Sequence, residues 1–178
     1  MKDLMDMDFH TKLKNAEFWF TQASQMFEAS KALFNSMTSR DSSDELRVGA
    51  HKGSLFLLGI ATENAFKGVL TFKEELKIEN ERLKPITPKG VSPHDLEWLS
   101  EKIGHTFSEK EIELFKRLSV YTIWAGKYGT PLKKSEFIKD KGEMFQSESD
   151  YDAISDVISR LKIEAGFNKN SGWPSLRS

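Results

Sequence analysis

The sequence predicts an all-α protein that folds as an up-and-down bundle of about five helices. Apolar residues recur at helical spacing along most of the chain, and no segment shows a convincing strand alternation. Short and medium loops separate the expected helices, which makes an up-and-down bundle the simplest packing. With 178 residues the chain suits one domain. We therefore expect a single helical domain over residues 1–178, with a loosely ordered tail from about residue 167 that Trp173 could anchor.

The first two helices are expected at about 11–37 and 44–74, joined by a polar loop at 38–43. Ser42 and Glu45 fit a capping box, in which both side chains satisfy free backbone N–H groups at the start of the second helix. Each glycine inside a helix costs about 1 kcal/mol relative to alanine. Glycines in the second helix therefore indicate close approach of a neighbouring backbone, or else mark bends and frayed ends. They are Gly49, Gly53, Gly59 and Gly68.

A third helix is expected to begin at Ser92 and to end near Gly104, after a loop at 75–92. Ser92 is the expected N-cap and Pro93 the first helical residue, which is a favourable combination. His94 would then lie in the first turn, where the positive end of the helix dipole disfavours a charged imidazole.

Two further helices complete the expected bundle. The segment Ser108 to Glu111 is a capping box that opens a helix to about Gly126. Residues 132–149 are charged and rich in serine and are expected to form an exposed loop. The last helix is expected at about 150–165, with Gly166 directly after its end.

Composition excludes several classes of protein. The formal net charge is -1 and the pI is about 6.4, so the whole chain carries no basic footprint for nucleic acid. There are no cysteines, which removes disulfides and thiolate chemistry. Residues 1–10 do not resemble a signal peptide, and the apolar run at 55–61 is far shorter than the roughly 20 residues that span a bilayer. We expect a cytoplasmic protein with no membrane partner.

The usual metal and phosphate motifs are absent from the sequence. It contains no His-x-x-x-His, His-Glu-x-x-His or Glu-x-x-His, and neither glycine-rich phosphate loop. Serine nucleophile elbows are also missing. We therefore expect no metal site and no cofactor.

The most informative stretch is the apolar segment at 55–70, because it keeps Glu63, Asn64 and Lys67 in its interior. Burying a charge costs several kcal/mol unless the charge is paired. Glu63 and Lys67 stand four residues apart, which places them on one face of a helix with the glutamate on the favourable N-terminal side. A helix this apolar is expected to use these groups, either structurally or chemically.

Two other segments carry polar groups of the same kind, Pro93 to Leu96 and Trp124 to Tyr128. A buried hydrogen-bonded network that ties helices together is the simpler interpretation, and a ligand-binding or catalytic cleft is the alternative. Two lysines close together in such a cleft would favour an anion such as phosphate. The candidate ligand-binding residues are Glu63, Asn64, Lys67, His94, Asp95, Lys127 and Tyr128.

At these three segments the chain resembles the HEPN superfamily, the higher eukaryote and prokaryote nucleotide-binding domains, and especially its small bacterial members. The matching sequences are Ala61-Thr-Glu-Asn-Ala-Phe-Lys-Gly68, His94-Asp-Leu96 and Trp124-Ala-Gly-Lys-Tyr-Gly129. Their order and spacing carry the resemblance, which covers about residues 46–135. It implies a helical, dimeric protein that binds nucleotide or RNA, in defence or toxin–antitoxin systems.

The chain departs from the HEPN pattern at three points. Lys127 stands where the family has arginine, which loses the bidentate fork for phosphate. Gly129 stands where the family has proline. The ribonuclease signature of active members, an arginine and a histidine separated by four to six residues, has no match, because Arg47 and His51 are separated by three.

We therefore expect a HEPN-like nucleotide- or RNA-binding protein, with a homodimer as its assembly, a further protein partner as an option and weak or absent catalysis. One alternative is a metal-independent endoribonuclease that uses the pair Arg47 and His51, or His94. Arg47 and His51 taken alone fit a solvated pair better than a site. The other alternative is a structural dimerisation or interaction module, whose polar cluster only holds the bundle together.

Overall fold

The computed structural model describes residues 8–39, 42–131, 133–135 and 145–174. Within these residues it delimits six α-helices, which confirms the predicted all-α bundle. The predicted loop at 132–149 lies largely outside the described residues. The α-helices are α2 (Phe9–Leu13), α3 (Ala16–Met37), α4 (Asp44–Phe72), α5 (Leu96–Ile103), α6 (Glu109–Val120) and α8 (Glu148–Glu164).

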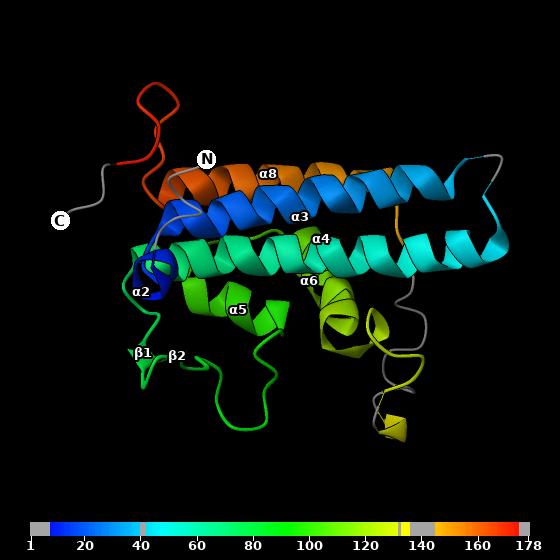
Figure 1. Ribbon diagram of the computed structural model, residues 1–178, viewed down its shortest axis with the longest axis horizontal. Helices are drawn as coiled ribbons and strands as arrows, with labels where there is room; N and C mark the ends of the chain where they lie inside the picture. The colour runs from blue at the N-terminus through cyan, green and yellow to red at the C-terminus, as the bar shows by residue number, and fades with distance from the viewer. Residues whose placement is uncertain (1–7, 40–41, 132, 136–144, 175–178) are drawn as a thin grey trace.

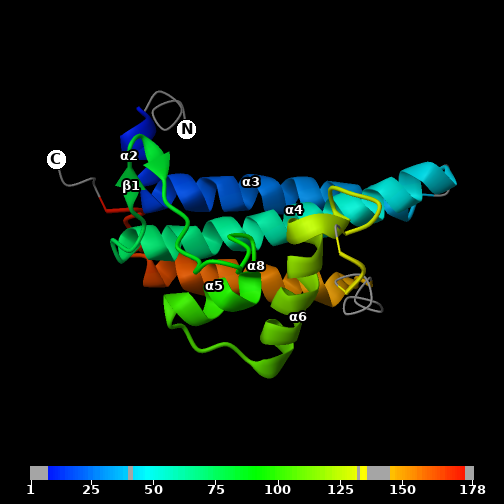
Figure 2. The ribbon, with the colours of Figure 1, turned by 90° about the horizontal axis from the view of Figure 1, so that it is seen from below.

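Three long helices form the body of the bundle, and α4 is its central helix. Helices α3, α4 and α8 run lengthwise beside one another, while α5 and α6 cover the opposite side of α4 (Figures 1 and 2). From Ser54 to Thr71, α4 is buried or half-buried at every position. A helix that is apolar on all sides is stable only when neighbours surround it, as they do here.

Glycines in α4 allow two of these neighbours to approach closely. A Cβ atom on Gly59 would lie 2.5 Å from Cγ2 of Thr122, and one on Gly68 would lie 2.6 Å from the ring of Phe20. The predicted approach of a neighbouring backbone is found at Gly59, where the carbonyl of Leu118 would lie 3.4 Å from the Cβ atom, whereas the close neighbour of Gly68 is a side chain. Gly49 differs, since a Cβ atom there would meet nothing within 4 Å.

The N-caps of the first two long helices differ from the predictions, although α4 begins at Asp44 as predicted. The helix predicted over 11–37 is interrupted, because Asn15 caps α3 by accepting a hydrogen bond from the Glu17 amide at 2.9 Å. The predicted capping box of Ser42 with Glu45 is wrong. Ser43 is the N-cap of α4 and accepts from the Leu46 amide at 3.2 Å. Serines at neighbouring positions offer the same chemistry, so only tertiary packing selects between them.

The start of α5 is also later than predicted. Asp95 is its N-cap and accepts a hydrogen bond from the Trp98 amide at 3.1 Å, whereas Ser92 accepts from the amide of His94 at 3.2 Å in the preceding turn. His94 therefore precedes the helix and does not lie in its first turn. The predicted capping box of Ser108 and Glu111 is confirmed at the start of α6.

Two features had no signal in the sequence. Residues 75–92 contain a small antiparallel hairpin of β1 (Ile78–Glu79) and β2 (Arg82–Leu83). Helix α6 continues into a π-helical turn, η1 (Tyr121–Ala125), closed by the Gly126 amide on the Tyr121 carbonyl at 3.1 Å.

The described part of the C-terminal tail packs against the bundle. The ring of Trp173 lies 5.4 Å from the ring of Phe20 on α3 and 5.3 Å from that of Phe167. A bridge between Asn168 and Gly172 closes the turn that positions this tryptophan.

Helix α4 is long and apolar enough to cross a membrane by length and composition alone. In the bundle, 67% of its most apolar window is buried against other helices. This burial is typical of the core helix of a folded domain, and it is weak evidence about a membrane in either direction.

Candidate functional site

A polar cluster of Glu63, Lys67 and His94 lies where α4 meets the segment before α5. Glu63 and Lys67 stand one turn apart on α4, and the Lys67 ammonium donates to Oε1 of Glu63 at 2.5 Å. The Glu63 side chain is only 4% exposed, whereas that of Lys67 is 19% exposed. The ammonium also lies 5.6 Å from the centre of the Trp19 ring.

His94 completes the cluster from a segment 31 residues further along the chain. Its Nδ1 atom lies 3.0 Å from Oε2 and 3.1 Å from Oε1 of Glu63. An ionised carboxylate only accepts hydrogen bonds, so Nδ1 carries the proton and donates it to Glu63. The second ring nitrogen, Nε2, makes no hydrogen bond within the described residues, and the side chain is 39% exposed.

The end of α6 and the π turn that follows it hold the backbone that carries His94. The hydroxyl of Thr122 donates to the carbonyl of His94 at 2.8 Å, and the hydroxyl of Ser119 accepts from the Leu96 amide at 2.9 Å. Thr122 reaches this position because Gly59 on α4 leaves room for its methyl group. Single π turns inside α-helices occur often at functional sites, because they re-aim side chains.

The electrostatics of the cluster are set by competing effects on Glu63. Burial by itself raises the pKa of this carboxyl. The hydrogen bond from His94, and the charge and hydrogen bond of Lys67, outweigh burial and hold its pKa below the ordinary value of 4.5. Glu63 is therefore ionised at neutral pH, and it is compensated by Lys67 and by the imidazole.

The other predicted ligand-binding residues do not join this cluster through a described contact. Asn64 is half-buried on α4, next to Glu63, and Asp95 uses its carboxylate to cap α5. The Lys127 ammonium lies 5.7 Å from the centre of the Phe56 ring, and Tyr128 is 59% exposed. The third motif therefore lies against an earlier part of α4.

Arg47 and His51 are engaged in different contacts. The guanidinium of Arg47 donates to the carbonyl of Ser42 at 3.2 Å and to that of Ser39 at 3.4 Å, which ties down the turn before α4. Nε2 of His51 lies 3.4 Å from the hydroxyl of Tyr121. Neither described contact resembles a catalytic arrangement.

One buried charged pair was not anticipated from the sequence. The guanidinium of Arg117 on α6 donates to Asp150 on α8 at 2.6 Å, and both side chains are less than 10% exposed. It also stacks on the ring of Phe145 at 3.9 Å. Burial raises the pKa of the neighbouring Tyr121 hydroxyl to about 12, although Arg117 opposes this effect. The only sign of this buried pair in the sequence is that Arg117 stands among apolar residues of α6.

The polar cluster lies outside the two cavities described for the molecule. The described residues contain cavities of about 950 and 200 Å³, and none of the seven predicted ligand-binding residues lines either of them. Within the same part of the chain, no group of three or more His, Cys, Asp and Glu side chains is placed to hold a metal ion. What the cluster offers chemically is an imidazole oriented by a carboxylate beside an ammonium, at a half-exposed surface.

Comparison of the chain with models of protein families, with curated proteins and with solved structures finds no match.

Proposed function

We propose that this protein binds RNA or a nucleotide as a HEPN-like helical domain with weak or absent catalysis. The observation that supports the proposal is the meeting of Glu63 and Lys67 with His94. These residues belong to two of the three segments that carry the HEPN resemblance, and the fold brings them into direct contact.

In this proposal, the ligand's phosphate groups lie at the half-exposed edge of the cluster. Glu63 orients the imidazole through Nδ1, which leaves Nε2 of His94 to donate to a phosphate oxygen when the ring is protonated. The ammonium of Lys67 adds a positive charge nearby. When the imidazole is protonated, Glu63 cancels one of these two positive charges, and the charge that remains attracts the phosphate.

The test is a fluorescence-anisotropy titration with a labelled short single-stranded RNA and a panel of nucleotides. His94→Asn is expected to weaken binding about tenfold or more, which corresponds to the loss of one charge-assisted hydrogen bond. The matched control is His105→Asn. His105 makes an equivalent contact with Glu164, at 2.6 Å, in a different part of the bundle. Absence of saturable binding, or equal losses in both variants, would reject the proposal.

A specific observation favours a structural module as the second candidate. The groups of the cluster bind one another, and no described cavity is lined by them. In that case the cluster holds the α5 segment to α4 and has no ligand. His94→Asn would then lower the melting temperature while no RNA or nucleotide binds to the parent protein.

We expect purified protein to cleave single-stranded RNA poorly or not at all. Arg47 and His51 stand four residues apart, so on a helix their side chains point in directions about 40° from each other. The longer spacing of the HEPN signature gives a different angle between the arginine and the histidine. The assay is incubation with mixed-sequence RNA in chelator, comparing the parent with His51→Ala and His94→Ala. Efficient cleavage that is lost with His51→Ala would establish the endoribonuclease alternative, and loss with His94→Ala alone would place catalysis at the polar cluster.

The proposed assembly is a homodimer in the cytoplasm, with a protein partner as part of a defence or toxin–antitoxin pair. Light scattering on the purified chain measures directly whether it is a dimer. A monomer at all concentrations used in the RNA titration would remove the dimer from the proposal without affecting the ligand.

A further inference from the structure

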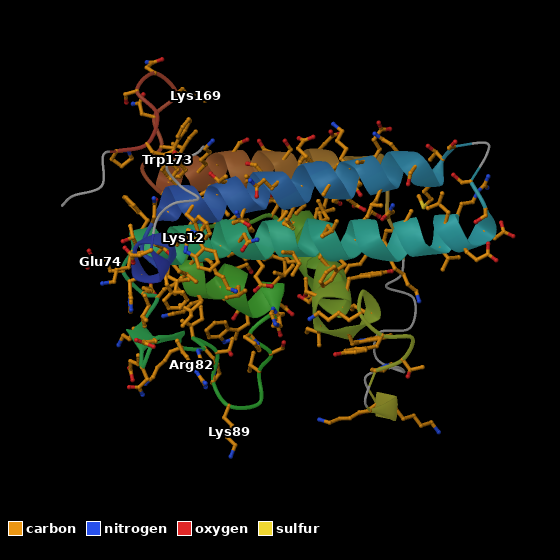
Figure 3. All side chains as sticks on the ribbon, in the orientation of Figure 1. Lys12, Glu74, Arg82, Lys89, Lys169 and Trp173 are labelled. Atoms are coloured by element: carbon orange, nitrogen blue, oxygen red, sulfur yellow. The ribbon has the colours of Figure 1, made fainter. Side chains whose placement is uncertain are left out.

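A cavity of about 950 Å³ lies at one end of the bundle, and its lining on α4 begins at Thr71, one helical turn after Lys67 of the polar cluster. It is formed where α3 begins, where α4 and α8 end, and where the C-terminal tail folds back. Figure 3 labels Glu74 and Trp173 at this end of the molecule. Cavities of 300 to about 1,000 Å³ that are largely preformed are the usual sites for small ligands.

One wall of the cavity is apolar. It is made by Leu13, Phe72, Leu76 and Trp173. Phe72 is the last residue of α4, and it is 48% exposed although its ring packs against Gly166. The ring of Trp173 is held in place by Phe20 and Phe167, so this wall is rigid on the side of the tail. An aliphatic chain or a ring would gain burial here.

The side chains that line the cavity carry a net negative charge. Two carboxylates, Glu17 and Glu74, line it together with one ammonium, Lys14. Within the described residues, neither carboxylate makes an ion pair. Helices α4 and α8 present their C-terminal ends to the cavity and α3 presents its N-terminal end, so the helix dipoles also sum to a negative potential.

Glu74 has a backbone conformation that favours glycine. Its φ angle is +57°, and it follows the cap of α4 at the position where helices commonly end in glycine. A glutamate here costs conformational energy that glycine would avoid. Glu74 is exposed and lines the cavity, and within the described residues its carboxylate makes no ion pair.

We propose that this cavity binds an amphipathic organic ammonium ion. The apolar body of the ligand packs on Phe72 and Leu76, and its cationic head lies toward the carboxylates of Glu17 and Glu74. The inference is independent of RNA or nucleotide binding, because none of the residues involved belongs to the polar cluster.

The experiment is an NMR and calorimetric titration of the full chain with three probes of the same length: hexyltrimethylammonium, hexanesulfonate and hexanol. The ammonium is expected to bind most tightly and to shift resonances of residues 72–76 and 173. Propyltrimethylammonium is expected to bind more weakly, because it buries less apolar surface.

Variants of the carboxylates provide the decisive comparison. Glu74→Gln is expected to weaken ammonium binding about two- to fivefold, the value of one partly exposed ion pair. Glu109→Gln is the matched control, because Glu109 lies in the first turn of α6 and does not line the cavity. Glu74→Gly is expected to raise the melting temperature and to weaken binding as much as Glu74→Gln does.

Three results would overturn the proposal. They are the absence of saturable ammonium binding, equal or tighter binding of hexanesulfonate, and an affinity that Glu74→Gln leaves unchanged. Because Glu74→Gly relieves backbone strain, its folding is not in question, and a loss of binding in that variant reports on the carboxylate itself.

Discussion

Replacing Lys67 with methionine tests whether the polar cluster stabilises the fold. Methionine keeps the length and the apolar stem of lysine and removes only the ammonium. Glu63, whose side chain is 4% exposed, then loses its closest counter-charge. Removing one partner of a fully buried ion pair typically costs about 3–5 kcal/mol.

The structure lowers this expected cost for two reasons. Lys67 itself is 19% exposed, and His94 still donates to Glu63 after the substitution. We therefore expect Lys67→Met to reduce the free energy of unfolding by about 2–3 kcal/mol. For a chain of 178 residues, this corresponds to a fall in melting temperature of about 4–12 °C.

The pH dependence of the loss identifies its cause. The pKa of Glu63 is depressed in the folded state, so its contribution to stability is present above the unfolded value near 4.5 and is lost as the pH falls through the folded value. The ammonium of Lys67 acts only on ionised Glu63. The difference in stability between Lys67→Met and the parent should therefore be largest near pH 7, and it should close at acid pH.

The measurement is urea unfolding of the parent and Lys67→Met at several pH values, with Lys116→Met as the control. Lys116 also contacts a glutamate, Glu113, at 2.9 Å, but on the solvent-exposed face of α6. The control is expected to unfold with the parent, because exposed pairs contribute little. If Lys67→Met also unfolds with the parent at pH 7, then Glu63 is solvated and the cluster does not stabilise the bundle.

Gly59→Ala is expected to destabilise the protein by about 1–3 kcal/mol in chemical unfolding, because the new Cβ atom would clash with Thr122. Gly49→Ala adds the same atom to the same helix in open space, so it should stabilise the protein by up to about 1 kcal/mol. If both variants change the free energy of unfolding equally, then the Thr122 side chain moves aside at little cost. Arg117→Met is expected to cost about 3–5 kcal/mol, because Asp150 is left buried without its partner. A thermal melt within 2 °C or so of the parent's would show that water reaches Asp150.

The extent of the helices was predictable because it depends on local chemistry. The capping box at Ser108 and the apolar spacing of the long helices act within a few residues, and both are found in the structure. The residues that cap α4 and α5 were less predictable. Several Ser, Asp and Asn residues near each start can cap a helix, and the choice among them depends on where the preceding chain arrives.

The candidate site was predictable only in part. A buried glutamate needs a partner, and the spacing of Glu63 and Lys67 supplied one. That His94 joins them depends on Thr122 and on the π turn that carries it, since the Thr122 hydroxyl holds the His94 carbonyl. No sequence pattern marks a π turn or a contact between segments this far apart. For the same reason, the sequence did not predict that the segment Trp124 to Tyr128 packs against Phe56.

The amino-acid sequence alone determined the helical class of this protein, the unusually apolar character of its second long helix and the need to neutralise Glu63. Each of these follows from periodicity or from the cost of burying a charge, which act on neighbouring residues. Tertiary structure alone decided that the cluster is half-exposed, that Arg117 is buried against Asp150, and that a cavity opens beside Glu74. Each of these features brings together residues that are far apart in the sequence. Their contacts depend on how whole helices pack, which local sequence patterns do not specify.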